Sequence, residues 1–203
     1  MSRKNQFKTF QISSNTNAES KLAYIDLIVE YSLKHGINFE ARTITIADEI
    51  NSELFSKVDA AITLMESGSL STITLKIFSH GGDTCAAMAV AARMRKSKCS
   101  FITEGYGQIM SAATLLLASG DKRKIDRNAQ FMWHEGSSDL ESLKVSEIVN
   151  MADQLKKEEL TWANEMGKLT KKPAKFWKEC GVGVDQYFTA EDLVKYGVVD
   201  EIF

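Results

Sequence analysis

The chain has 203 residues, of which 44% are hydrophobic and 26% are charged, and its formal net charge is −2. A chain of this length and composition can bury one core, so we expect a single domain over residues 1–203. The absence of a basic surplus argues against nucleic acid as a partner, and no apolar run is long enough to cross a bilayer.

The cysteines are odd in number and widely spaced, at Cys85, Cys99 and Cys180. This pattern favours reduced thiols and a cytoplasmic location over a disulfide framework. No cysteine or histidine cluster has the spacing of metal ligands, so we expect neither a metal nor a cofactor.

Helical and extended patterns alternate along the chain. Apolar residues recur at helical spacing, or helix formers dominate, over residues 18–35, 48–66, 84–95, 111–119 and 140–168, and a capped segment runs over 189–197. Strand patterns occupy residues 42–46, 73–78, 99–103 and 131–133. Along the last long helix, Glu and Lys stand at spacings that allow ion pairs. This alternation predicts an α/β fold with right-handed crossovers and a mainly parallel sheet.

In such a sheet, chemistry is concentrated where a strand ends and a helix begins, and two segments lie at such joints. One is Gly81-Gly82, and the other is Ser111. A serine that opens a helix lies near the positive end of the helix dipole, and the amide of Ala112 could donate to an oxyanion. The alternative is that Ser111 only caps its helix, as serine commonly does.

The chain has three histidines, His35, His80 and His134. His35 falls in the last turn of the first helix, and His80 precedes two glycines in a turn. His134 follows the apolar triplet Phe131-Met-Trp133, where a buried strand would emerge. A general base needs such a half-buried position, although a structural histidine can occupy one too.

Asp185 follows the glycine-containing segment Gly181-Val-Gly-Val184 and precedes Tyr187-Phe188. A carboxylate beside apolar residues needs a partner, which an imidazole N–H can supply. An ordinary loop aspartate is the alternative.

The order of these motifs is more specific than any one of them. Five runs occur in sequence: Phe78-Ser-His-Gly-Gly82, Gly107-Gln-Ile-Met-Ser111, Met132-Trp-His134, Asp185-Gln-Tyr-Phe-Thr-Ala-Glu191 and Tyr196-Gly-Val-Val-Asp200. Together they resemble the Clp protease proteolytic subunit (ClpP) family, including divergent or viral members, over about residues 40–203. Residues 1–40 form a divergent N-terminal segment.

The resemblance implies a ClpP/crotonase-type fold of repeated βαβ units with a projecting helical handle at residues 135–167. It implies a serine endopeptidase that cleaves peptides and unfolded proteins with the triad Ser111, His134 and Asp185. The backbone amides of Gly82 and Ala112 would form the oxyanion hole. It also implies a homo-oligomer of one or two heptameric rings around a chamber.

Two other functions remain open. A catalytically silent ring subunit would contribute only structure, but such subunits usually lack a member of the triad. A crotonase-type acyl-CoA enzyme would use paired backbone amides as an oxyanion hole without needing Ser111, His134 and Asp185 together.

The sequence departs from the family pattern at several positions. His80 replaces a proline, Glu135–Glu141 replaces a glycine-rich strand, and Gly183-Val184 replaces a charged pair that links the two rings in many members. Thr74, Lys76 and Lys96 replace apolar positions at which an AAA+ unfoldase docks. We therefore expect weak or absent docking of ordinary Clp ATPases.

Overall fold

The computed structural model describes residues 34–137 and 144–203, together with Asp26, Val29, Glu30 and Ser32. Most of the helix expected over residues 18–35 lies outside the described residues, but those that are described are helical. Gly36 follows with a φ of 65°, as expected for a residue that ends a helix.

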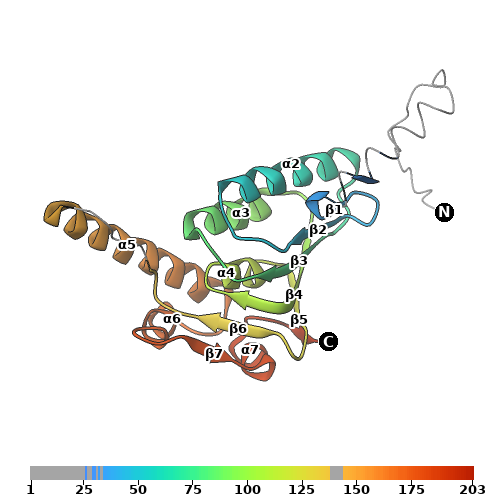
Figure 1. Ribbon diagram of the computed structural model, residues 1–203. Helices are drawn as coiled ribbons and strands as arrows, with labels where there is room; N and C mark the ends of the chain where they lie inside the picture. Colours follow the sequence, from blue (N-terminus) through green and yellow to red (C-terminus); the bar gives the residue numbers. More distant parts are fainter. Residues whose placement is uncertain (1–25, 27–28, 31, 33, 138–143) are drawn as a thin grey trace, which may run out of the picture.

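A mixed sheet forms the centre of the described part of the chain (Figure 1). Its main path runs β1-β2-β3-β4-β5-β8, and β6 and β7 extend it from β4. All neighbours are parallel except the β1–β2 and β6–β7 pairs. The strands are β1 Ile37–Asn38, β2 Thr43–Ile46, β3 Ile73–Ser79, β4 Phe101–Met110, β5 Lys122–Ile125, β6 Gln130–Trp133, β7 Gln186–Phe188 and β8 Glu201–Ile202.

The helices are α2 Ser52–Gly68, α3 Thr84–Lys96, α4 Ala113–Ala118, α5 Val145–Leu169, α6 Ala174–Cys180 and α7 Ala190–Tyr196. Alternating side chains of the strands supply the core: Ile73, Leu75 and Ile77 of β3 are fully buried. The buried face of α2 and the alanine-rich face of α3 belong to the same core. The small alanines of α3 allow this helix to approach its neighbours closely.

Strand β4 is the branch point of the sheet. Its first half pairs with β5 through Ile102–Gly105, and its second half pairs with β6 through Gln108–Met110. The register against β3 shifts between Ile77 and Ser79, and Gly107 adopts a φ of 56° at the same place. Because glycine tolerates this conformation, the strand can bend here and turn its end toward β6.

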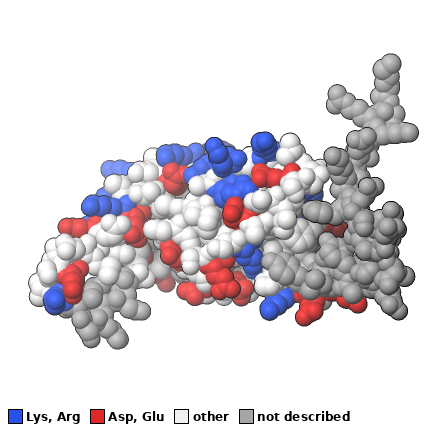
Figure 2. Space-filling model, turned by 90° about the horizontal axis from the view of Figure 1, so that it is seen from above, with Lys and Arg blue, Asp and Glu red and all other residues white. Residues whose placement is uncertain are grey.

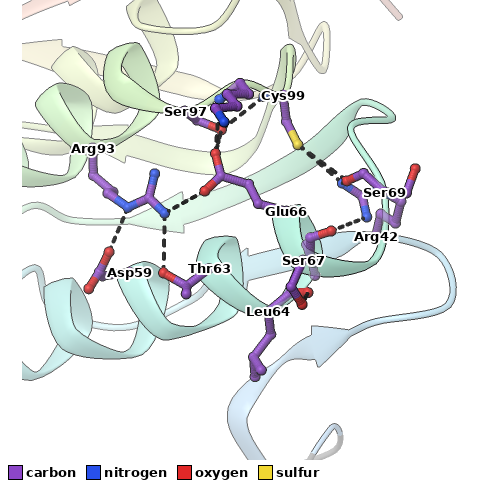
Figure 3. A network of polar contacts seen from close by, with 12 residues as sticks. Arg42, Asp59, Thr63, Leu64, Glu66, Ser67, Ser69, Arg93, Ser97 and Cys99 are labelled. Atoms are coloured by element: carbon purple, nitrogen blue, oxygen red, sulfur yellow. Dashed lines mark hydrogen bonds and ion pairs between the residues drawn. The ribbon is translucent and has the colours of Figure 1, made fainter. Parts of the chain in front are cut away.

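A polar network ties α2 to α3 and to the loop that follows it (Figure 3). Arg93 donates from Nε to Asp59 Oδ1 at 2.6 Å and from Nη2 to Glu66 Oε2 at 2.9 Å. Glu66 also accepts from the Ser97 hydroxyl and from the Lys98 amide. Because Arg93 and Ser97 donate to its charged form, the pKa of Glu66 is lowered to about 2.

Arg42 closes the C-terminal end of α2 in the same region (Figure 3). Its guanidinium donates to the carbonyls of Met65 at 2.9 Å and Ser71 at 2.8 Å, and also to those of Ser69 and Thr72. The Met65 carbonyl also accepts from the Ser69 amide, so Arg42 gives it a second donor and binds the carbonyls of the loop that follows the helix.

Helix α5 projects from the body of the protein, and its C-terminal part packs against it (Figure 1). Trp162 of α5 stacks on Trp133 of β6 with ring centroids 4.0 Å apart, and Trp177 of α6 lies 5.0 Å from Trp133. Trp133 Nε1 donates to the Trp177 carbonyl at 2.7 Å. These contacts hold the end of β6 in place.

The predicted α/β class is confirmed, and the sequence patterns located the long elements within a few residues. The strand expected over residues 99–103 was too short, because β4 continues to Met110. The helix expected from Ser111 was also wrong at its start, because α4 begins at Ala113. Of the expected handle, α5 starts at Val145, and residues 138–143 lie outside the described residues. On α5, Lys156–Asp153 and Lys168–Glu165 form ion pairs of the expected kind.

On the face drawn in Figure 2, Lys and Arg gather along the upper edge, and Asp and Glu lie between and below them. Among the described residues of that face, no broad basic patch of the kind that binds nucleic acid is visible. Within the described ranges, no helix is long and apolar enough to span a membrane.

Candidate active site

Three strands bring the predicted triad residues to one place. In β6 and β7, Trp133 lies opposite Gln186, so the next positions along the antiparallel pair are His134 and Asp185. Met110 of β4 lies in register with Met132 of β6, and the Ser111 amide donates to the Met132 carbonyl at 2.9 Å. Ser111, His134 and Asp185 therefore lie at the same edge of the sheet, next to the ends of β4, β6 and β7.

Ser111 does not cap the helix that follows it. The N-cap of α4 is Ala112, which makes no side-chain capping hydrogen bond. Ser111 has a φ of 52°, a left-handed conformation that is uncommon for a residue with a side chain. Its Oγ lies 2.8 Å from His134 Nε2. The bend between strand and helix thus turns the hydroxyl toward the imidazole.

The link between His134 and Asp185 is looser than the link to Ser111. His134 Nδ1 lies 3.8 Å from Asp185 Oδ1, which is beyond hydrogen-bond distance, and the Asp185 side chain is 58% exposed. The imidazole is 23% exposed. The serine and histidine can therefore exchange a proton directly, while Asp185 lies close enough to act on the imidazole through its charge.

Gly81 and Gly82 run close beside Ser111. A Cβ on Gly81 would lie 2.6 Å from Ser111 Cβ, and a Cβ on Gly82 would lie 2.3 Å from the Ile50 carbonyl oxygen. Both glycines have positive φ values, 107° and 138°. Only glycine fits this approach of one backbone to another.

The amides of Gly82 and Ala112 remain available to a substrate. The bridge between Ile50 and Gly82 uses the Gly81 carbonyl and the Asp83 amide, not the Gly82 amide. Within the part of the chain that the structure describes, neither Gly82 nor Ala112 donates a backbone hydrogen bond. Two such donors beside a serine hydroxyl can stabilise negative charge on a carbonyl oxygen.

A cleft of about 310 Å³ opens onto Ser111 and His134. Its other walls come from the start of α3, the segment after β6 and one face of α5. The lining residues are Gly82, Asp83, Thr84, Cys85, Gly136, Ser137, Leu155, Glu158, Glu159 and Trp162. In the described residues no group of His, Cys, Asp and Glu is arranged to hold a metal ion.

Carboxylates set the electrostatics of this cleft. Burial raises the pKa of Glu159, and the negative charge of Glu135 raises it further, while Lys178 opposes the shift. Burial likewise raises the pKa of the Cys85 thiol, helped by the charges of Glu158 and Asp83. The thiol is therefore less readily ionised than an ordinary cysteine, which makes Cys85 a poor nucleophile beside Ser111.

The acidic wall of the cleft was missed by the sequence patterns. Leu155, Glu158, Glu159 and Trp162 repeat at the spacing of one helix face, and this spacing was the available signal. It assigns the four residues to one face but does not reveal that this face lies opposite Ser111. His80, in contrast, is exposed and is not among the residues that line the cleft.

Known proteins with similar sequences point to the same family. A family model described as Clp protease matches residues 33–203, slightly more than the expected residues 40–203. ATP-dependent Clp protease proteolytic subunit 2 of Treponema denticola is 33% identical over 168 residues, covering 79% of this chain and 81% of the relative. The subunit 2 of Nocardia farcinica is 28% identical over 192 residues, covering 92% and 90%.

A solved structure shares the fold. A point mutant of ClpP1 from Listeria monocytogenes superimposes with a TM-score of 0.74 at 23% sequence identity, covering 85% of this chain and 95% of that one. The chain of 203 residues therefore belongs to the Clp protease family, and it is a peptidase with the ClpP fold.

Proposed function

We propose that the protein is a serine endopeptidase that hydrolyses peptides and unfolded proteins through Ser111, His134 and Asp185. The observation that carries the proposal is the 2.8 Å contact between Ser111 Oγ and His134 Nε2 at the floor of an open cleft. A serine held against an imidazole is the arrangement that activates a hydroxyl for attack on a carbonyl.

The reaction follows from this geometry. Ser111 Oγ attacks the peptide carbonyl carbon while its proton passes to His134 Nε2. The oxyanion accepts hydrogen bonds from the amides of Gly82 and Ala112, each typically worth about 3 kcal/mol in the transition state. His134 then protonates the leaving amine, and the C–N bond breaks to leave an ester on Ser111. Water, deprotonated by His134, hydrolyses that ester and frees the serine.

Asp185 supports the imidazole rather than the substrate. Its negative charge near Nδ1 favours the tautomer with the proton on Nδ1 and stabilises the imidazolium. At 3.8 Å the contact is an electrostatic one.

The two alternatives fit the site less well. A silent structural subunit has no need of a serine in a left-handed conformation pointing at a histidine. A crotonase-type enzyme would use the paired amides alone. Turnover of a peptide without coenzyme A separates these functions from peptide hydrolysis.

The test compares the wild-type protein with Ser111→Ala on a fluorogenic peptide. We expect hydrolysis by the wild type, and a loss of about 10⁴-fold or more in the variant. Circular dichroism and the native mass of the particle should be the same for both proteins. Unchanged turnover in Ser111→Ala would end the proposal.

We also propose assembly into one or two rings around a chamber, heptameric as the family resemblance implies. Apolar side chains on the projecting part of α5 support association, because Val145 is 78% exposed and Val149 is 55% exposed. Val182 and Val184, near Asp185, are 58% and 56% exposed. Association would bury this surface, and light scattering that found an active monomer would contradict it.

We expect an AAA+ unfoldase to dock weakly on this protein or not at all. Thr74 and Lys76 lie on the outer face of β3, and Lys96 is exposed at the end of α3. A second cleft, of about 280 Å³, is lined by Lys76 beside Phe78 and Tyr106. An ammonium group in this cleft opposes the entry of an aliphatic anchor, because the charge would lose water.

A further inference from the structure

The charged side chains that line the cleft beside Ser111 are all acidic among the described residues. Asp83 at the start of α3 and Glu158 and Glu159 of α5 line it, while no Lys or Arg side chain does so among the described residues. Burial, together with the charges of Glu158 and Asp83, raises the pKa of the Cys85 thiol, which also lines the cleft. A substrate side chain entering this cleft therefore meets negative charge on two sides.

The α5 wall combines these charges with apolar surface. Leu155, Glu158, Glu159 and Trp162 follow one another at helical spacing on the face that lines the cleft. Leu155 offers contact to an aliphatic chain, and the two glutamates follow it along the helix, before the buried Trp162. A long aliphatic stem that ends in a cation matches this order, as in lysine and arginine.

We propose that this cleft selects substrates with lysine or arginine as the residue whose carbonyl Ser111 attacks, and that Glu158 and Glu159 determine that selectivity. The proposal rests on the proposed peptidase function and adds the substrate class.

The glutamates are only partly compensated by their neighbours. Glu158 Oε1 accepts a neutral hydrogen bond from Gln154 Nε2 at 2.8 Å. Glu159 is influenced by one cation, Lys178, and by the like charge of Glu135. Burial and this repulsion raise the pKa of Glu159, so its charged form is held at a cost. A substrate cation relieves that cost on binding, because it pairs with the carboxylate.

The same wall also holds a buried polar group without a partner in the described part of the chain. Trp162 lines the cleft and is 1% exposed, yet its Nε1–H has no hydrogen-bond acceptor among the residues described. A buried indole N–H normally has one.

The experiment uses peptidyl-coumarin amides that differ only in the residue before the coumarin. Arginine and lysine substrates should be cleaved with kcat/KM about tenfold above that of norleucine, which has a similar stem without the charge. A glutamate substrate should be the poorest. The preference for arginine over norleucine should shrink as salt is added, because ions screen the pairing.

Two variants assign the effect to the α5 wall. In Glu158→Gln/Glu159→Gln the ratio of arginine to norleucine cleavage should fall toward one, because only Asp83 of the three lining carboxylates remains. Asp153→Asn is the matched control, since it removes an exposed charge of the same helix that does not line the cleft. Its ratio should equal that of the wild type.

Inhibition of the wild-type protein tests the same selectivity if the double variant fails to assemble. A peptide aldehyde ending in arginine should inhibit at about a tenfold lower concentration than one ending in norleucine. Cleavage that favours norleucine or leucine, or a preference unchanged by the double variant, would overturn the selectivity and leave the peptidase function standing. Absence of any cleavage, with no labelling of Ser111 by a fluorophosphonate, would overturn both.

Discussion

Ser111 directly follows β4 in a left-handed conformation, and this backbone geometry turns its hydroxyl away from ordinary helix capping. A serine in the first turn of a helix would donate or accept within the helix, as in ordinary capping. Here the Ser111 carbonyl accepts from the Thr114 amide and hydroxyl, which leaves the side chain to His134. The two neighbouring glycines allow the chain to pass close beside Ser111.

Substitution of the histidines tests which of them is the general base. His134→Ala should lower kcat/KM by about 10⁴-fold because it removes the base. Asp185→Asn should cost no more than this, because its carboxylate lies 3.8 Å from Nδ1 and is half exposed. His80→Ala is the control, since His80 is exposed and outside the cleft, and it should retain substantial activity. An inactive but folded His80→Ala would require a different base.

The packing of α2 against α3 is stabilised by the contact between Glu66 and Arg93, which weakens when Glu66 is protonated. The pKa of Glu66 is depressed from 4.5 to about 2 in the folded protein. A group with a depressed pKa stabilises the fold above its unfolded pKa and loses this contribution as pH falls through its folded pKa. The stabilisation from Glu66 is therefore complete above about pH 5 and fades toward pH 2.

Glu66→Gln should destabilise the protein at neutral pH by about 1–3 kcal/mol, because Arg93 loses its charged partner. Thermal unfolding at a series of pH values measures the difference. The difference in stability between the variant and the wild type should become smaller as pH falls from about 5 toward 2. If this difference in stability did not change with pH, the charge of Glu66 would not contribute to the stability of the fold.

The elements also show what the sequence could and could not predict. Apolar periodicity located α2 and β3 because burial of one face leaves a clear pattern, and the alanine-rich composition of residues 84–95 located α3. Strands β5 and β8 were missed because Lys122-Arg-Lys124 reads as polar and Glu201–Ile202 is only two residues long. The order of motifs identified Ser111, His134 and Asp185 as one group. The acidic wall escaped notice because periodicity does not say which neighbour a helix face meets.

For the whole molecule, the outer face of the sheet differs from a simple apolar docking surface. Lys76, Glu104, Lys124 and Glu201 lie side by side across β3, β4, β5 and β8. Lys124 pairs with Glu104 at 3.5 Å, and Tyr106 donates to the other Glu104 oxygen at 2.9 Å. Lys124 and Glu104 compensate each other across the strands, so this face presents charged side chains rather than a continuous apolar surface.

We therefore expect a standard Clp ATPase not to accelerate degradation of a tagged folded substrate by this protein in the presence of ATP. Docking an aliphatic anchor beside Lys76 would cost several kcal/mol in desolvation. Lys76→Leu removes that charge from the cleft and should increase any stimulation. Efficient ATP-dependent degradation by the wild type would show that the lysines do not block docking.

The central claim is that Ser111 is a nucleophile activated by His134, and covalent labelling tests it most directly. A fluorophosphonate reacts with an activated serine hydroxyl, and mass spectrometry of the digested protein locates the adduct. We expect labelling at Ser111, loss of labelling in His134→Ala and retention in His80→Ala. An adduct at another residue, or no adduct in a preparation that hydrolyses peptides, would contradict the claim.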